Sequence, residues 1–341
     1  MRKFTAVLCV LVALSAWALT ACTFESHKEE VVGTYYAYLW STEGGYVENK
    51  DNYFTLYEDG RCKYSIRDIM AASGLVAAGD PEDMYSGETR FDYDGETLYL
   101  RFASMISWEI CDGAFRSGET FFGKSDGEKP YEVKDSVRYA KYSKEEYKVF
   151  CLDDREISEI TIVSELNGRA VKEIMHHAFA YYTELKEVTL ERGFSKINYA
   201  AFRECVNLQS ITLPDGITEI GNRAFFKTAI EEFVMPDSVT SIDSELFGGC
   251  ESLKSVNVSR NLKTLPFNTF FDCNSLESVF LPKSIVEIES MVFYNTSGLI
   301  VNYEGTKSDW GNISKDDRWS YGAENLTVKC SDGDIVYEER A

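Results

Sequence analysis

The sequence of 341 residues predicts a mainly β protein, in which an antiparallel β meander or barrel-like domain precedes a solenoid with a parallel strand stack. Three observations lead to this prediction. The second half repeats every 22 or 23 residues, which is typical of solenoids. The first half has short strand-like runs joined by Asp-Gly, a strong hairpin signal. An apolar N-terminal segment comes before both parts.

The N-terminus has the features of a secretory signal. Two basic residues precede an apolar run over residues 4–19, and the letters LTAC then end at Cys22. A basic start, an apolar centre and small residues before a cleavage site are typical of such signals. The ending on Cys resembles the lipobox of bacterial lipoproteins, which implies that residues 1–21 are removed and that Cys22 is lipidated. A transmembrane anchor is the alternative, but the apolar run is at the short edge for a span and its C-terminal flank is not basic.

The formal net charge of −21 bears on location and partners. A chain this acidic repels nucleic acid and anionic lipid head groups, so neither is an expected partner. We expect a body on the bacterial cell envelope, surface-exposed and attached to the membrane through the N-terminal lipid only. Residues 22–30 then form a tether. The sequence leaves open whether the lipid sits in an outer membrane or in a single cell membrane.

Residues 31–148 are expected to form the antiparallel domain. The run GTYYAYLW is rich in β-forming residues, and YFTLYEDGRCKYSI and RFDYDGETLYLRF each predict two strands around an Asp-Gly turn. Residues 66–80 are predicted to be a short helix or a long loop. The pattern resembles the lipocalin-like domains of bacterial lipoproteins. Tyr36, Tyr38 and Trp40 share one face of the first run, where they would line a cavity or fill a core.

One segment of this domain, Gly118–Ser125, reads GETFFGKS and matches the phosphate-binding pattern G-x-x-x-x-G-K-[ST]. A phosphate loop needs a buried strand before it and a helix after it. Gly127 and Pro130 follow here and do not begin a helix, while Phe121 and Phe122 favour a strand. We therefore expect a strand that ends in a turn at residues 125–127, and no nucleotide.

The second half contains three columns of apolar residues that recur in phase. All three share a single 22-residue step near Lys227 and Thr228. Each unit contains a strand in which apolar and polar residues alternate, then a turn that ends the strand, and then a second short apolar segment. Stacked units share one core. The columns are Phe179, Phe202, Phe225, Phe247, Phe270, Phe293; Ile174, Ile197, Ile220, Ile242, Leu265, Ile288; and Leu185, Leu208, Ile230, Leu253, Leu276, Leu299.

These units resemble the BspA-like leucine-rich repeat family, whose units read roughly A-F-x-x-C-x-x-L-x-x-I-x-L-P-x-x-V-x-x-I. The match covers about residues 160–305, and the first unit departs from the period by a loop at Asn167-Gly168. The segments VNYEGTKSDWGNI and VKCSDG resemble the family's closing segment and last strand. The resemblance implies repeats over residues 149–312 and a C-terminal cap strand within residues 313–341. Two motif positions recur, at Pro214, Pro236, Pro282 and at Cys205, Cys250, Cys273.

Nine cysteines are present, and none forms a C-x-x-C pair, so a dense disulfide framework or a zinc site is not expected. The repeat cysteines are expected to be small buried hydrophobic residues, because Tyr182, Thr228 and Thr296 occupy the same column. We expect no metal and no cofactor. The sequence leaves open the disulfide state of Cys62, Cys111, Cys151 and Cys330.

Catalytic motifs give no support for an enzyme. The chain lacks H-E-x-x-H and G-x-S-x-G, and its three histidines are His27, His176 and His177. Adjacent side chains point apart, so a surface turn is favoured over a zinc pair at His176-His177. We therefore expect a binding protein.

Solenoids bind partners with the face of their strand stack. Val234 and Phe280 are apolar where water is expected, which indicates a contact patch, although single exposed apolar residues are common. The resemblance implies protein–protein interaction in adhesion to host or neighbouring-cell macromolecules, with an extracellular protein or glycan as ligand. The alternative is an envelope lipoprotein that carries a small apolar ligand in the N-terminal domain. The outward-facing candidates are Glu187, Ser210, Glu232, Ser255, Ser278 and Thr189, Thr212, Val234, Asn257, Phe280.

Overall fold

The computed structural model describes the backbone of the strands between residues 33 and 124, and residues 131–337 apart from 143–144, 153 and 155. The chain divides into two compact units, one made of residues 1–39 and 48–130 and the other of residues 40–47 and 131–341. The proposed signal, Cys22, residues 66–80 and the side chains of Tyr36, Tyr38 and Trp40 lie outside the described part.

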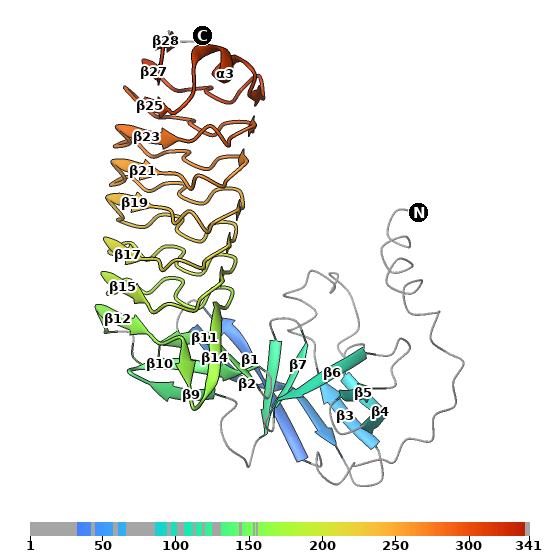
Figure 1. Ribbon diagram of the computed structural model, residues 1–341. Coiled ribbons are helices and arrows are strands. Elements are labelled where there is room, and N and C mark those ends of the chain that lie inside the picture. The colour runs from blue at the N-terminus through green and yellow to red at the C-terminus, as the bar shows by residue number, and fades with distance from the viewer. Residues whose placement is uncertain are drawn as a thin grey trace, which may run out of the picture. The chain divides into compact units, whose positions relative to one another are not determined.

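The first unit contains a closed antiparallel barrel in which each strand pairs with the next and the last pairs with the first. The predicted antiparallel meander is therefore confirmed, and the strands that flank residues 57–60 and 94–96 pair antiparallel (Figure 1). The strands are β1 (Gly33–Ser41), β2 (Gly45–Leu56), β3 (Arg61–Ser65), β4 (Ser86–Tyr93), β5 (Thr97–Leu100), β6 (Ile106–Cys111), β7 (Ala114–Ser117) and β8 (Thr120–Lys124).

The GETFFGKS segment provides the strand that closes this barrel. β8 pairs antiparallel with β7 and with β1, where Lys124 lies opposite Tyr35 and Phe122 lies opposite Ala37. Residues 121–123 thus pair with a strand on both sides. The prediction of a strand is confirmed for residues 120–124, and the predicted turn at residues 125–127 lies outside the described residues.

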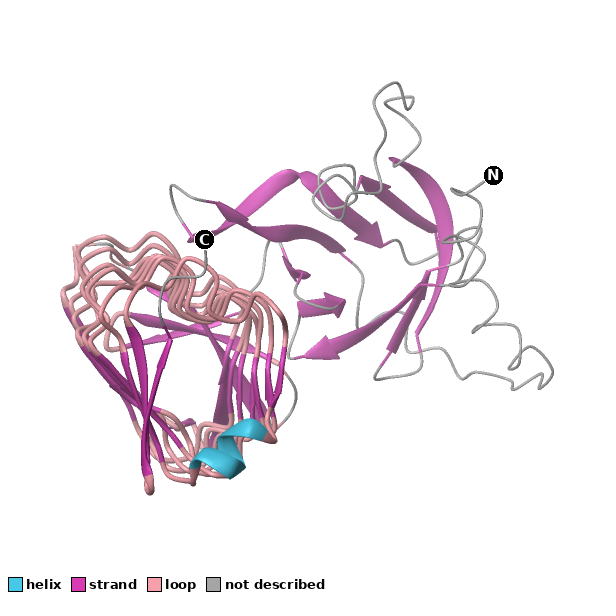
Figure 2. Cartoon of the chain, turned by 90° about the horizontal axis from the view of Figure 1, so that it is seen from above, coloured by secondary structure: helices cyan, strands magenta, loops and turns pink. Residues whose placement is uncertain are grey.

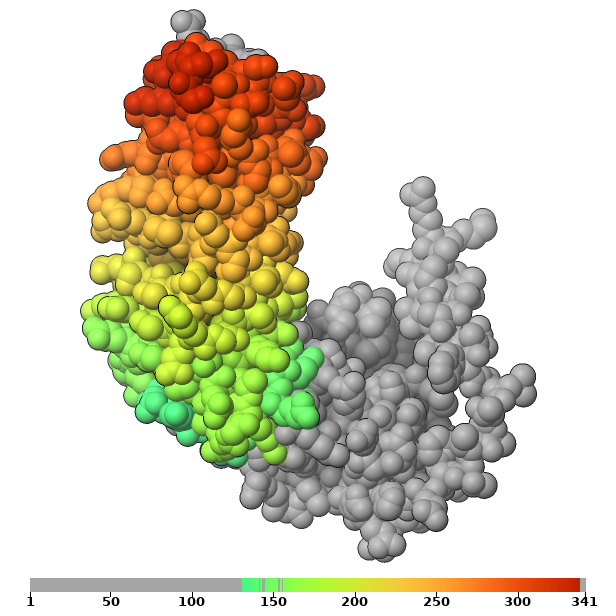
Figure 3. Space-filling model, in the orientation of Figure 1, coloured from blue at the N-terminus to red at the C-terminus, as the bar shows by residue number. Residues whose placement is uncertain are grey.

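In the second unit, residues 146–329 form a parallel β-solenoid of about eight turns. Figure 3 shows successive turns as bands of sequence colour on the surface. Seen along the stack, the turns superimpose, with strands on two sides and loops joining them (Figure 2). We call the side that contains residues 210–212 the first strand face, and the side that contains residues 219–220 the second strand face.

The first strand face carries the outward columns predicted from the sequence. It consists of two sheets, because one sheet ends at β17 and the next begins at β19. The 22-residue step lies between these two strands. In order, the strands are β12 (Glu159–Ile162), β15 (Glu187–Leu190), β17 (Ser210–Thr212), β19 (Glu232–Val234), β21 (Ser255–Asn257), β23 (Ser278–Leu281), β25 (Ile300–Tyr303), β27 (Leu326–Cys330) and β28 (Gly333–Tyr337).

The second strand face begins with three antiparallel strands, and β11 then pairs parallel with β14. Residues 131–148, which the sequence pattern assigned to the first domain, are therefore paired into the solenoid. The strands are β9 (Tyr131–Lys134), β10 (Val137–Lys141), β11 (Glu146–Leu152), β13 (Glu165–Leu166), β14 (Arg169–Ile174), β16 (Lys196–Ile197), β18 (Glu219–Ile220), β20 (Ser241–Ile242), β22 (Thr264–Leu265), β24 (Glu287–Ile288) and β26 (Ser314–Lys315).

The second strand face is also divided, between β20 and β22, and a proline explains the division. In most turns the residue after the second strand donates its N–H to the turn below, as Asp243 donates to Ile220 at 3.0 Å and Glu289 to Leu265 at 2.9 Å. Pro266 holds this position in the turn between them and has no N–H to donate. The hydrogen-bonded ladder therefore stops at Ile242.

The core is built on the phenylalanine column. All six rings are buried, and adjacent rings stack with centroids 5.0 to 5.8 Å apart and interplanar angles of 2 to 16°. The column ends edge-on against Trp319, at 5.9 Å from Phe293. The isoleucine and leucine columns are buried as well, so all three predicted columns are confirmed as core.

Both ends of the repeats are closed by local structure. The insertion in the first unit is a hairpin between β13 and β14, whose turn residues Asn167 and Gly168 have the positive φ values that such a turn requires. At the other end, the helix α3 (Lys307–Gly311) begins at a Thr306 capping box. β28 then pairs antiparallel with β27, so the C-terminal cap is a hairpin rather than the single strand that was expected.

Candidate functional site

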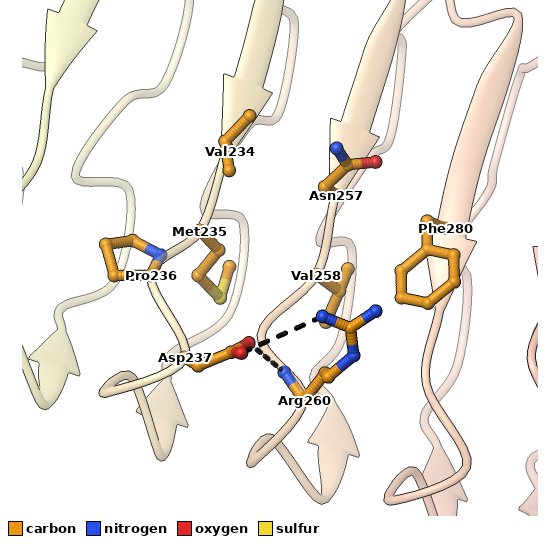
Figure 4. A pocket seen from close by; sticks show the side chains of 8 residues that line it. All are labelled: Val234, Met235, Pro236, Asp237, Asn257, Val258, Arg260 and Phe280. Atoms are coloured by element: carbon orange, nitrogen blue, oxygen red, sulfur yellow. Dashed lines mark hydrogen bonds and ion pairs between the residues drawn. The ribbon is translucent and has the colours of Figure 1, made fainter. Parts of the chain in front are cut away.

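The first strand face carries a groove of about 360 Å³ beside β19, β21 and β23. Its lining comes from three consecutive turns at the point where each strand ends, as Figure 4 shows. The groove contains the two apolar outward residues that the sequence singled out. The lining residues are Val234, Met235, Pro236, Asp237, Asn257, Val258, Arg260 and Phe280.

The strand register brings the apolar residues of the groove together. Val234 lies beside Asn257, which in turn lies beside Phe280 on the next strand. The Val234 side chain is 68% exposed, whereas Met235 and Val258, which alternate with the outward residues, are buried. The groove therefore offers apolar surface on its rim and a packed base.

Arg260 supplies the positive charge of the groove. Its guanidinium carbon lies 5.5 Å from the centroid of the Phe280 ring, within the range of a cation–π contact. The same guanidinium lies 3.9 Å from the Asp237 carboxylate and 4.0 Å from that of Glu304. The Arg260 side chain is 62% exposed, so its charge is available to a partner.

Backbone contacts hold the loops that form the groove. The Asp237 carboxylate accepts the backbone N–H of Arg260 at 2.8 Å, and the Asn261 side chain donates to the Asp237 carbonyl at 2.6 Å. The buried Ser259 hydroxyl donates to the Val239 carbonyl at 2.6 Å. Each contact joins one turn to the next, so the groove is preformed.

The predicted outward columns exist as register pairs. Glu187 and Thr189 lie beside Ser210 and Thr212, and beyond the division Glu232 and Val234 begin the second part of each column. Their role in partner binding stays a prediction. The second part continues through Ser255, Ser278 and Asn257, Phe280.

The charged half of the groove was not predicted from the sequence. Asp237 and Arg260 stand in loops after the strands, where no column pattern selects them. A signal was present, because each residue stands three positions after the last residue of its strand. Asp237 follows Val234 in this way, and Arg260 follows Asn257. The missed lining residues are Met235, Pro236, Asp237, Val258 and Arg260.

The cysteine column satisfies backbone carbonyls inside the solenoid. Cys205, Cys250 and Cys273 are fully buried, and their Sγ atoms donate to phenylalanine carbonyls of the preceding turn at 2.8 to 3.1 Å. Burial raises the pKa of the Cys250 thiol to about 11. The prediction that these residues are buried is confirmed. Among residues 131–337 as described, no cluster of histidine, cysteine or acidic side chains is placed to hold a metal ion.

The histidine pair lies in a turn, as predicted, but His177 is half-buried. Its ring packs edge-on against Tyr199, with centroids 5.0 Å apart. Burial, with a smaller effect from the nearby charges of His176 and Arg203, lowers the pKa of His177 to about 4. The side chain is therefore neutral at physiological pH.

A family comparison agrees with the geometry. Residues 172–300 match the model of the BspA type leucine rich repeat region, in six copies. This segment of the chain thus consists of BspA-type leucine-rich repeats. No curated protein matches the sequence. Within the described residues, no helix has the length and apolar character that crossing a membrane requires.

Several solved bacterial structures are similar to the chain. A leucine-rich repeat protein of T. pallidum is 26% identical, with a TM-score of 0.46, over 50% of this chain and 85% of that one. A leucine-rich cell surface protein of Faecalibacterium prausnitzii is 22% identical, with a TM-score of 0.47, over 64% of this chain and 60% of that one. A leucine-rich repeat protein of Bacteroides ovatus is 18% identical, with a TM-score of 0.37, over 58% of this chain and 71% of that one.

Proposed function

We propose that the protein is a lipid-anchored binding protein of the bacterial cell surface that contacts other macromolecules through its first strand face. The partner is an extracellular protein of the host or of a neighbouring cell, and the biological role is adhesion. The observation that carries this proposal is the groove, where exposed Val234 lies near Phe280 and Arg260. An exposed aliphatic residue and a partly exposed aromatic ring next to an arginine resemble the centres of protein interfaces, where aromatic residues and arginine are enriched.

Binding to immobilised host matrix proteins and to whole bacterial cells tests this proposal. A Val234→Glu variant places a charge in the groove and should weaken binding about tenfold or more, since desolvating an unpaired charge is costly. Val286→Glu is the matched control, because Val286 is also an exposed valine, 57% exposed, and lies outside the groove. Equal binding by the wild type and Val234→Glu would contradict the proposal.

Protease treatment of intact cells tests the location separately. Loss of the repeats, detected with an antibody while an internal control protein stays intact, is the expected result. Complete protection until lysis would contradict a surface location. In that case the lipid anchor at Cys22 would hold the protein on an inner side of the envelope.

A second candidate function is favoured by the closed topology of β1 to β8, because small barrels of this strand number can enclose one small ligand. Under this alternative the N-terminal unit carries an apolar molecule. Saturable uptake of a fluorescent fatty acid by the purified chain, unaffected by Val234→Glu, would support it. The absence of saturable uptake would contradict it.

A further inference from the structure

A second hollow of about 420 Å³ lies on the loops between the phenylalanine column and the first strand face. We call it the short-turn notch. It is formed by residues of four successive turns and is separate from the groove described above. The residues that matter to its chemistry are Val206, Lys227, Ala229, Glu251, Phe271 and Asp272.

The notch follows from the one short unit of the repeat. From the column phenylalanine to the column leucine the chain takes six residues in neighbouring units, as from Phe202 to Leu208, but only five from Phe225 to Ile230. The shorter loop leaves space between the loops of the adjacent turns. Val206 on one side and Glu251 on the other become its walls, and Ala229 lies at the short loop itself.

The floor and one wall of the notch are held by contacts within the protein. Thr228 is buried, and its hydroxyl donates to the Phe225 carbonyl at 3.1 Å. Gly249 has a φ of +69°, and a Cβ added there would lie 2.9 Å from Cγ of Lys227, so the stem of Lys227 passes over the glycine. The Lys227 ammonium lies 5.4 Å from the Phe226 ring centroid. The residue is exposed, and these two contacts position its stem beside the hollow.

Hydrogen-bond donors and acceptors both line the notch, next to apolar side chains. Lys227 donates hydrogen bonds, while the carboxylates of Glu251 and Asp272 accept them. Asp272 is oriented by the Asn295 side chain, which donates to it at 2.9 Å. Val206, which is 49% exposed, and the Phe271 ring add the apolar part.

This composition disfavours an anion, because it would meet the carboxylates of Glu251 and Asp272. The Lys227 ammonium offsets part of their attraction for a cation, so a ligand whose groups both donate and accept hydrogen bonds suits the three side chains. A neutral sugar ring has hydroxyl groups that both donate and accept, and its C–H groups form an apolar face that packs on an aromatic ring. The volume of the notch lies within the usual range of about 300–1,000 Å³ for small-molecule sites.

We propose that the short-turn notch binds one neutral hexose unit of a glycan. This site is independent of the protein-binding role proposed for the first strand face. The ligand stacks on Phe271 and Val206, and its hydroxyls bond with Lys227, Glu251 and Asp272.

Titration of the purified chain with neutral methyl glycosides of glucose, galactose, mannose and N-acetylglucosamine, followed by calorimetry, tests this site. At least one glycoside should bind saturably at millimolar concentration. Glu251→Gln removes a charge-assisted acceptor and should weaken binding about tenfold. Glu277→Gln, an exposed glutamate outside the notch, and Val234→Glu in the groove should leave the affinity unchanged.

Two further variants remove the space itself. Insertion of one asparagine between Ala229 and Ile230 restores the 23-residue spacing, and Ala229→Trp fills the hollow; both should abolish binding. Circular dichroism checks that each variant folds. If the insertion variant does not fold, Ala229→Trp and Glu251→Gln together test whether the notch binds the sugar. The proposal is overturned if no glycoside binds saturably, if both notch variants bind like wild type, or if glucuronate or glucosamine binds more tightly than the neutral sugars.

Discussion

The phenylalanine column makes the stability of the solenoid depend on each ring, and Phe247 near the middle is the most informative position to change. Its side chain is fully buried. It stacks between Phe225 at 5.8 Å and Phe270 at 5.7 Å, and Phe233 meets it edge-on at 4.8 Å. Phe247→Ala would open a cavity that the hydrogen-bonded turns above and below cannot close.

The magnitude follows from this geometry. Replacing a buried phenylalanine by alanine costs about 3–5 kcal/mol, and each aromatic pair adds about 0.5–1.5 kcal/mol beyond its buried area. With three ring partners, Phe247 should lie near the upper end, at about 4–5 kcal/mol. Phe267→Ala is the matched control, because Phe267 is 37% exposed, and it should cost less than half as much.

Native-state hydrogen exchange with mass spectrometry measures this loss where it occurs. Peptides covering β19 to β25 should exchange about a thousandfold faster in Phe247→Ala, since about 1.4 kcal/mol corresponds to a factor of ten. Peptides from the barrel strands should keep their wild-type rates. An acceleration below tenfold in the solenoid peptides would refute the view that the ring stack carries the stability of the solenoid.

Two other positions give independent tests. Since burial lowers the pKa of His177 to about 4 from 6.5, the unfolded chain binds a proton in this range that the folded chain does not, and stability is lost as pH falls from 6.5 to 4. His177→Asn should reduce the drop in melting temperature between pH 7 and pH 5; an unchanged drop would contradict this. Gly248→Ala would place a Cβ 2.2 Å from Cε1 of Phe271 and should cost about 1–3 kcal/mol in urea denaturation, whereas Gly311→Ala, with nothing within 4 Å, should not destabilise. Equal stability of the two glycine variants would contradict the packing argument.

The predictable part of the fold is the part that repeats. Phe179 to Phe293 and the two aliphatic columns were recognisable because each turn must bury the same positions against its neighbours. The outward columns followed from strand alternation, so Val234 and Phe280 were found before the structure was known. The barrel strands were recognisable from their Asp-Gly turns, which are local signals.

The candidate site was only half predictable for the same reason. Asp237 and Arg260 lie in loops of different turns, and their proximity depends on the stacking of one turn on the next. The division at Pro266 is a related case. The proline is plain in the sequence, but its effect needs the knowledge that this position donates to the turn below.

By itself, the sequence determined the period, the buried columns, the strand alternation and the place of the one short unit, because these depend on spacing along the chain. Only the tertiary structure decided that residues 131–148 pair with the repeats, that the strand faces are divided at β17 and β20, and that the short unit opens a notch. These features arise from contacts between turns about 23 residues apart, where one missing residue or one missing N–H changes which groups meet.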